Sequence, residues 1–269
     1  MNLGNKIFDI NSNTYVMGIM NITPDSFSDG GQYNTLDKAL KHGERLVNEG
    51  ADILDIGGES TRPGHVQISA EEEIDRIKPI IKGLKKEFDI PISIDTYKSQ
   101  VARIALDLGA DMVNDIWGLK YDYDIAKLVN EYQVPVCIMH NRKNTDYVDF
   151  ISDTLQDLSD SIIIAKEAGI SDNQIIIDPG VGFAKSYENN LEVIKKLDRY
   201  KTLGYPILLG TSRKSVIGLT LDLPFEERVE GTLVTTVMAV MTGCAFVRVH
   251  DVKENVRAIQ MTKAIMEVG

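Results

Sequence analysis

Short apolar runs alternate along this chain with longer segments in which apolar residues recur at helical spacing. Most of the short runs are continuous rather than alternating and are rich in β-branched residues, which is typical of strands covered on both faces. Several of the longer segments end at glycine, as at Glu49-Gly50 and Leu108-Gly109, a common stop signal for helices. The pattern therefore predicts a parallel sheet whose strands are connected by helices.

This pattern places eight strands and eight helices in strict alternation. The expected strands cover residues 15–20, 52–56, 92–95, 111–114, 134–139, 175–177, 206–209 and 245–249. The expected helices cover residues 35–49, 70–87, 98–108, 122–132, 150–168, 187–201, 213–241 and 252–267. We expect the helix over 213–241 to break near Pro224. Eight such units in 269 residues predict an α/β fold, a (β/α)8 TIM barrel.

The first residues of the chain stand outside this alternation. Residues 6–16 read KIFDINSNTYV, in which Asn-Ser-Asn separates two short runs. This spacing predicts an N-terminal β-hairpin that closes the bottom of the barrel. The rest of the sequence contains neither a linker nor a break in composition, so we expect a single barrel domain over residues 1–269.

Composition and charge restrict the classes of partner. The chain is 43% hydrophobic and 26% charged, with a net charge of -11 and no long run of Lys or Arg. Nucleic-acid surfaces and anionic membranes require clustered basic residues, so neither partner is expected. Cys137 and Cys244 lie inside apolar runs and are expected to be buried free thiols. With no stretch of 18 apolar residues and no secretory signal at the N-terminus, a soluble cytoplasmic protein is expected.

Polar residues follow the ends of all eight expected strands. They include Asn21, Gly57 to Gly64, Asp95-Thr96, Asn114-Asp115, His140-Asn141, Asp178, Thr211 to Ser215, and Arg248 with His250. In a parallel barrel these positions meet at one mouth, where the active sites of this fold lie. An isolated Asp at such a position often only caps a loop. Eight polar strand ends in succession favour a functional site.

The residue types at these strand ends suggest a flat polar ligand and an anion. Asp95, Asn114 and Asp178 provide acceptors and one amide, which suit the donor-rich edge of a heterocycle. Cationic residues gather at the mouth of an otherwise acidic protein, a combination that suits an anionic substrate. These residues are Arg213, Lys214, Arg248 and His250. The segment TSRKS at 211–215 also opens a helix, whose free N–H groups favour a carboxylate or phosphate.

Seven short motifs, in order along nearly the whole chain, are similar to those of the dihydropteroate synthases. They are MGIMNITPDSFSDGG, DIGGESTRPG, SIDTYKSQVA, ND at 114–115, DPGVGF, GTSRKS and RVHDV. Members of that family use a (β/α)8 barrel to join 6-hydroxymethyl-7,8-dihydropterin pyrophosphate to 4-aminobenzoate, releasing pyrophosphate in folate synthesis. The resemblance implies the same transfer between these two substrates, with Mg2+ as cofactor. It also implies a homodimer that pairs through late helices, for which residues 232–242 offer an apolar face.

The resemblance also implies roles for individual residues. The pterin would be held by Asp95, Asn114, Asp178, Phe183 and Lys214. The pyrophosphate would be contacted by Asn21, Thr61, Arg248 and His250, with Asn21 also binding the Mg2+. The aminobenzoate would be bordered by Phe27, Thr61, Arg62, Pro63, Phe183 and Ser215. The catalytic set would be Asp95, Asp178, Lys214 and Arg248. No role is assigned to His140 or His65.

The implied chemistry is a displacement at a carbon attached to a heterocycle that shares positive charge. Such a reaction needs no covalent nucleophile, which agrees with the absence of any Ser-His-Asp or Cys-His signal. The segment TPDSFSDGG at 23–31 is expected to be loose without ligands and to close with the facing residues 60–64. Arg62 would then pair with Asp25 or Asp29, and the pterin substrate would bind before the aminobenzoate.

Three other functions are compatible with parts of this pattern. A pterin-dependent methyltransferase domain shares the barrel and the Asp/Asn/Asp floor, but it does not need the 23–31 and 60–64 loops. A non-catalytic pterin-binding protein would keep the floor and dispense with the metal site at Asn21. A phosphosugar barrel enzyme is disfavoured, because its phosphate site normally lies in Gly-rich loops after strands seven and eight.

Overall fold

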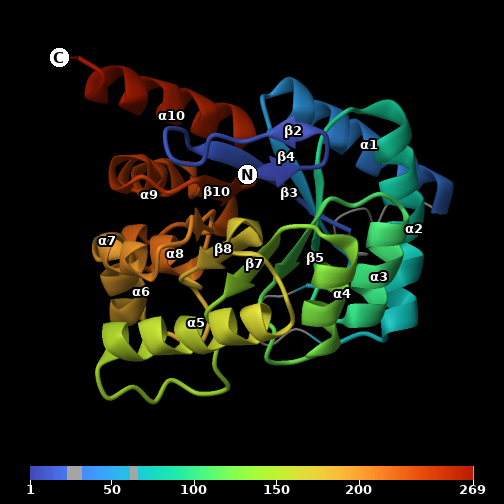
Figure 1. Ribbon diagram of the computed structural model, residues 1–269. Helices are drawn as coiled ribbons and strands as arrows, with labels where there is room; N and C mark the ends of the chain where they lie inside the picture. The colour runs from blue at the N-terminus through green and yellow to red at the C-terminus, as the bar shows by residue number, and fades with distance from the viewer. Residues whose placement is uncertain (23–31, 61–65, 269) are drawn as a thin grey trace.

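Eight parallel strands form the centre of the molecule (Figure 1). The computed structural model describes residues 1–22, 32–60 and 66–268. The strands are β3 (Tyr15–Asn21), β4 (Ile53–Gly57), β5 (Ile92–Asp95), β6 (Met112–Asp115), β7 (Val136–Met139), β8 (Ile175–Asp178), β9 (Leu208–Leu209) and β10 (Phe246–Val249). They are hydrogen-bonded in the order β8-β7-β6-β5-β4-β3-β10-β9. A parallel bridge between Ile177 and Ile207 joins the two ends of this sheet, so the predicted TIM barrel is confirmed.

Helices surround the barrel, as the alternation predicts. They are α1 (Gln32–Asn48), α2 (Ala70–Glu87), α3 (Ser99–Asp107), α4 (Asp124–Tyr132), α5 (Phe150–Glu167), α6 (Tyr187–Lys195), α7 (Leu197–Tyr200), α8 (Ser215–Leu221), α9 (Val229–Thr242) and α10 (Val252–Met266). The expected break near Pro224 separates α8 from α9. The expected helix over 187–201 is instead two helices, because Lys196 leaves the helical region with φ -110° and ψ 29°.

The N-terminal hairpin exists, but the sequence prediction misplaced its turn. The paired strands are β1 (Asn2–Leu3) and β2 (Lys6–Ile7), with Leu3 opposite Lys6. Gly4 begins the two-residue turn with φ +59°, a conformation that glycine adopts at little cost. The Asn-Ser-Asn segment at 11–13 instead leads into β3.

The hairpin closes one end of the barrel, as expected. The buried cluster there contains Leu3 and Phe8 together with Met17, Ile53, Met112, Cys137, Ile176, Leu208, Ala245 and Phe246. Most of these residues lie in the first halves of their strands, which leaves the carboxyl ends for polar side chains. A second and larger apolar cluster fills the space between the strands and the helices. Cys137 and Cys244 are both buried free thiols, as predicted.

Within the described part of the chain, no helix is both long enough and apolar enough to cross a membrane. Four residues predicted at the site, Phe27, Thr61, Arg62 and Pro63, lie outside the described residues. The same holds for Asp25, Asp29 and the expected closure of segment 23–31. These expectations stay predictions.

Candidate active site

Asp95, Asn114 and Asp178, whose side chains can accept hydrogen bonds, lie at the carboxyl ends of their strands. Asp95 ends β5 and stands directly opposite Asn114 on β6 in the sheet register. Asp178 ends β8. Only 3–4% of the surface of each of these residues is exposed. Because parallel strands bring their carboxyl ends to one edge, the barrel collects all three at its mouth, where the sequence analysis expected them.

Arg248 on β10 is held between two buried carboxylates. Its Nε donates to Asp55 Oδ2 at 2.6 Å, and its Nη2 donates to Asp95 Oδ2 at 2.5 Å. Asn114 Nδ2 also donates to Asp55 Oδ2, at 3.3 Å. Asp55 was not predicted as a site residue, although a fully buried carboxylate inside the apolar strand β4 is an uncommon feature. The aspartate in the apolar run DILDI was the signal available in the sequence.

The side chains of Asp178 and Lys214 both lie beside Gly210. A Cβ added to Gly210 would lie 3.5 Å from Asp178 Oδ2 and 3.8 Å from Lys214 Nζ. Lys214 also donates to the carbonyl oxygen of Val181, and its Nζ lies 4.8 Å from the centroid of the Phe183 ring. A cation over an aromatic face is an attractive contact. The predicted residues Asp178, Phe183 and Lys214 are therefore brought together.

The turn that follows Asp178 depends on a glycine. Asp178 Oδ1 accepts from the backbone N–H of Gly180 at 2.7 Å. Gly180 has φ +72°, and a Cβ there would lie 2.0 Å from the carbonyl oxygen of His140. A side chain at this position would push the turn away from β7. Gly180 thus fixes the orientation of the Asp178 carboxylate.

Burial dominates the electrostatics of these groups. It raises the pKa of Asp95 to about 7, against the attraction of Arg248 and with the added repulsion of Asp55. Burial likewise raises the pKa of Asp178, opposed by Lys214. Lys214 is affected in the opposite sense, since burial lowers its pKa to about 8 against the attraction of Asp178. Such perturbed groups cluster at functional sites, and a positively charged ligand would stabilise both carboxylates in their ionised form.

A second polar chain, which sequence reasoning missed, supports the loop after β8. His140 Nε2 lies 2.9 Å from Asp157 Oδ2, and His140 Nδ1 lies 2.7 Å from Lys185 Nζ. Lys185 also donates to the carbonyl oxygen of Phe183 at 3.1 Å. Burial lowers the pKa of His140 to about 4, so the ring is neutral at pH 7. Its Nδ1 then accepts from Lys185 while Nε2–H donates to Asp157.

This arrangement predicts a loss of stability in mild acid. The pKa of His140 in the folded protein, about 4, lies below the ordinary histidine value of 6.5 that applies in the unfolded chain. Between these values the unfolded chain binds more protons, so stability rises with pH and falls as the pH is lowered. From pH 7.5 to 5.0 this group should account for about 2 kcal/mol of lost unfolding free energy. Urea unfolding of wild type and His140→Gln at both pH values measures it. An equal pH difference in the two proteins would contradict the assignment.

The remaining predicted residues lie around the same mouth. His250 Nδ1 is 3.0 Å from Ser212 Oγ, and Ser215 is the first residue of α8. Arg213 was expected to contribute free positive charge, but it is paired with Asp251. The expected helix opening is also displaced, because Arg213 has φ +55° and α8 begins only at Ser215.

Asn21 ends β3 beside the acidic floor. A Cβ added to Gly57 would lie 3.8 Å from Asn21 Oδ1 and 3.6 Å from Asp95 Oδ2. Amide and carboxylate oxygens are the ligand types that Mg2+ accepts, usually together with waters and substrate phosphates. The donor set at this strand end therefore fits the predicted ion. No group of three His, Cys, Asp or Glu side chains that would hold a metal alone occurs among the described residues.

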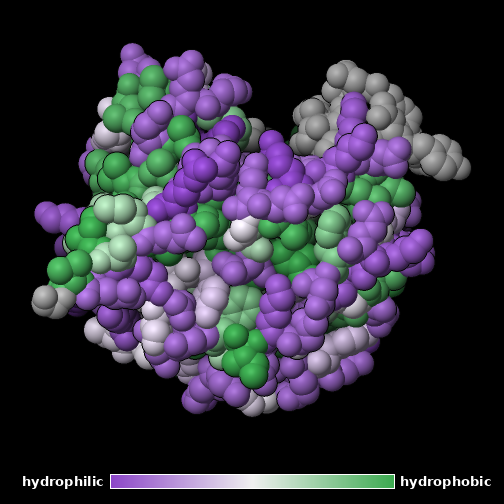
Figure 2. Space-filling view, turned by 90° about the horizontal axis from the view of Figure 1, so that it is seen from above, coloured by the Kyte–Doolittle hydropathy of each residue, from purple (hydrophilic) through white to green (hydrophobic). Residues whose placement is uncertain are grey.

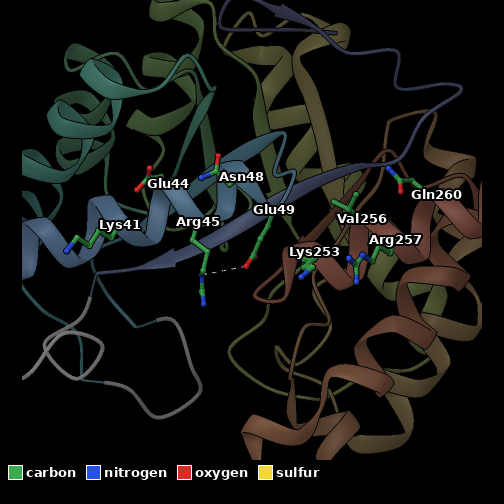
Figure 3. Close-up of a pocket in the computed structure, with 9 residues that line it drawn as sticks. All are labelled: Lys41, Glu44, Arg45, Asn48, Glu49, Lys253, Val256, Arg257 and Gln260. Carbon is green, nitrogen blue, oxygen red and sulfur yellow. Dashed lines mark ion pairs between the residues drawn. The ribbon is translucent and has the colours of Figure 1, made fainter.

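An open groove elsewhere on the molecule contains none of the predicted residues. It lies between α1 and α10 and is lined by Lys41, Glu44, Arg45, Asn48, Glu49, Lys253, Val256, Arg257 and Gln260 (Figure 3). Its one ion pair joins Arg45 to Glu49 at 3.8 Å. The lining is mainly charged side chains on the outer helices α1 and α10, whereas the buried groups with shifted pKa values lie at the strand ends. The candidate active site is therefore the one at the strand ends.

Comparison with known proteins identifies the family of this chain. A family model for pterin binding enzymes matches residues 17–250. A dihydropteroate synthase of Clostridium beijerinckii is 58% identical and covers 99% of both chains. A crystal structure of the Clostridium difficile dihydropteroate synthase in the presence of pteroic acid is 53% identical, with a TM-score of 0.94, over 96% of this chain and 99% of that one. The Xanthomonas albilineans dihydropteroate synthase with 4-aminobenzoic acid is 42% identical, with a TM-score of 0.91, over 95% and 94%.

The barrel, its buried polar mouth and the family match together define a pterin-binding enzyme. Within that class the chain belongs to the dihydropteroate synthase family. It is a transferase, and the resemblance expected from the seven sequence motifs is confirmed.

Proposed function

We propose that the chain condenses 6-hydroxymethyl-7,8-dihydropterin pyrophosphate with 4-aminobenzoate to give 7,8-dihydropteroate and pyrophosphate. The observation that carries this proposal is the buried floor formed by Asp95, Asn114, Asp178, Lys214 and Arg248 at one barrel mouth. Relatives solved with pteroic acid and with 4-aminobenzoic acid support it. The reaction needs residues that orient two substrates and stabilise a leaving anion, and this floor provides both.

In this proposal the pterin lies on the three acceptor side chains. Asp95 and Asp178 accept from its ring N–H groups, and their charges favour the positive charge that develops on the ring as the leaving group departs. Asn114 contributes an amide to the same edge. Lys214 and Phe183 would border the pterin ring from the side of the loop after β8. The Nζ of Lys214 lies 4.8 Å from the centroid of the Phe183 ring.

The pyrophosphate would occupy the cationic side of the mouth. Arg248, His250 and Thr61 would donate to its oxygens, and Arg248 keeps its charge there because the attraction of Asp55 and Asp95 outweighs the effect of burial and raises its pKa. Asn21 would hold the Mg2+ through its amide oxygen. When bound, the ion would supply positive charge to the leaving pyrophosphate. Asp95, Asp178, Lys214 and Arg248 form the proposed catalytic set.

The aminobenzoate would lie at the outer edge of the site. Phe183 and Ser215 would border it, together with Phe27, Thr61, Arg62 and Pro63. The start of α8 at Ser215 suits the carboxylate, because the first N–H groups of a helix attract anions. Binding of the pterin substrate before the aminobenzoate, as expected from the sequence, is part of this proposal.

Calorimetric titration tests the proposal and separates it from its rivals. The protein should bind the pterin pyrophosphate much more tightly with Mg2+ than with EDTA, and aminobenzoate should bind only after the pterin, Mg2+ and pyrophosphate are present. A methyltransferase domain or a non-catalytic binding protein would take the pterin without using Mg2+ or aminobenzoate. Equal aminobenzoate affinity for the bare enzyme would refute the proposed order.

A homodimer, formed through α9 and α10, is the proposed assembly. Helix α9 is apolar on both sides: Ala239 and Val240 are buried, whereas Val234 and Met241 are 61% and 65% exposed. Figure 2 shows hydrophobic patches toward the left of its view, the side on which Figure 1 places α9 and α10. A helix that is apolar all round is normally covered.

We therefore expect a dimer in sedimentation experiments at micromolar concentration, and a monomer after Val234→Glu combined with Met241→Glu. The control is Val148→Glu, which alters a fully exposed apolar side chain outside this face and should leave the dimer intact. A monomeric wild type would contradict the proposal.

We also propose that residues 1–269 form one domain, which limited proteolysis tests. We propose further that the protein is cytoplasmic, which cell fractionation tests.

A further inference from the structure

Asp55 is completely buried on β4, and its hydrogen bonds are with residues of the proposed site. Its Oδ2 accepts from Arg248 Nε at 2.6 Å and from Asn114 Nδ2 at 3.3 Å. Its Oδ1 is buried and has no hydrogen-bond partner in the described structure. A buried carboxylate with one unsatisfied oxygen is costly for a fold. Its presence calls for an explanation other than stability.

Asp115, one residue beyond Asn114, shows what a structural aspartate looks like in the same barrel. It is also fully buried, but both of its oxygens are satisfied by backbone donors. Oδ1 accepts from the N–H of Trp117 at 2.8 Å, and Oδ2 accepts from the N–H of Leu119 at 2.7 Å. Asp115 thus caps its own loop, whereas Asp55 caps nothing and contacts two side chains from other strands.

The hydrogen bonds of Asp55 fix the orientations of the Arg248 and Asn114 side chains. Arg248 is gripped at Nε by Asp55 and at Nη2 by Asp95, so the plane of its guanidinium is fixed from two directions. Of the five N–H groups of an arginine, three are then left for a ligand, and 17% of the side chain is exposed. For Asn114, donation from Nδ2 to Asp55 sets the orientation of the amide and leaves Oδ1 available as an acceptor.

We propose that Asp55 is a positioning residue for the transfer reaction. It aligns Arg248 toward the leaving pyrophosphate and Asn114 toward the pterin, without touching either substrate. This inference rests on the proposed function, since it assigns Asp55 a role through two residues of that site. Asp55 would thus orient one residue on the pyrophosphate side of the mouth, Arg248, and one on the pterin side, Asn114.

The test is steady-state kinetics with Asp55→Asn, which keeps the size of the side chain and removes its charge. We expect kcat/KM for the pterin pyrophosphate to fall about 10- to 100-fold, the range for losing a hydrogen bond to a charged group. KM for aminobenzoate should change less than twofold. The matched control is Asp115→Asn, an identical change at equal burial, which should lower the unfolding midpoint and leave kcat/KM within about threefold of wild type.

A double-mutant cycle with Arg248→Gln shows whether Asp55 acts through Arg248. In the Arg248→Gln background the further effect of Asp55→Asn should shrink to less than about threefold, because coupled residues are not additive. If Arg248→Gln does not fold, the comparison of Asp55→Asn with Asp115→Asn decides alone. Unchanged kcat/KM in Asp55→Asn, or equal losses in both asparagine variants, would overturn the inference. An inactive wild type would instead refute the proposed function.

Discussion

Asp178→Ala is expected to weaken pterin binding by about 2–5 kcal/mol, because the substitution leaves charged and polar partners buried and unpaired. In the free protein Asp178 accepts from Gly180 and faces Lys214 beside Gly210. It is also the carboxylate best placed to balance positive charge at the β8 side of the floor. We expect the barrel to remain folded, since the side chain lies at a strand end and outside the apolar clusters.

Calorimetry with the pterin ligand and a urea unfolding curve of the same variant measure both parts of this prediction. Asp178→Asn is the informative companion: it keeps one acceptor but loses the charge, so its affinity should fall between those of Asp178→Ala and wild type. A pterin affinity of Asp178→Ala within threefold of wild type, a difference below about 1 kcal/mol, would remove Asp178 from the pterin site.

Arg248→Met is expected to lower the unfolding free energy by about 3–5 kcal/mol at pH 7.5, the usual effect of removing one partner of a buried ion pair. The substitution leaves Asp55 and Asp95 buried side by side without their shared cation. Since burial raises the pKa of Asp95 and its protonation relieves that repulsion, the deficit should shrink as the pH falls toward 5.5. Urea unfolding at the two pH values measures the loss and its direction.

Two further variants show whether the buried ion pairs are the cause. Adding Asp55→Asn to Arg248→Met should recover part of the lost stability, because one uncompensated charge is removed. Arg103→Met is the matched control, since Arg103 pairs with Glu131 at the surface, where both side chains are about half exposed and such pairs contribute about 0–1 kcal/mol. A loss for Arg248→Met no larger than for Arg103→Met would show that the clamp is energetically unimportant.

The strands and their polar ends are predictable from the sequence. β5 occupies the expected residues 92–95, and α2 occupies the expected 70–87. These segments carry strong local signals, namely apolar runs bounded by glycine or proline and amphipathic helical spacing. Because a parallel barrel brings every strand end to one mouth, a correct list of strands already places Asp95, Asn114 and Asp178 together.

Pairings between distant side chains are not predictable in this way. The contact of Asp55 with Arg248 joins residues 193 positions apart, and it depends on the register in which β3 pairs with both β4 and β10. The chain His140–Asp157–Lys185 likewise connects a strand end, a helix and a loop. The hairpin turn at Gly4 was missed for a local reason: this two-residue turn is marked only by one glycine at positive φ, whereas the polar Asn-Ser-Asn segment carries a stronger compositional signal.

The contacts of Arg248 with buried carboxylates bear on the proposed transfer reaction. Asp95, which is proposed to favour a cationic pterin, also holds Arg248, which is proposed to receive the leaving anion. Positive charge on the ring and negative charge on the pyrophosphate develop together, so a shared set of fixed charges stabilises both ends of the breaking bond. No side chain is required to form a covalent intermediate.

The central claim is that this mouth joins the two substrates. It is tested most directly by mixing the protein with the pterin pyrophosphate, 4-aminobenzoate and Mg2+, and measuring pyrophosphate release and 7,8-dihydropteroate together. We expect both products to form in equal amounts, and Asp178→Ala to form neither at a comparable rate. Well-folded wild-type protein that releases no pyrophosphate, or that releases it without forming dihydropteroate, would contradict the account.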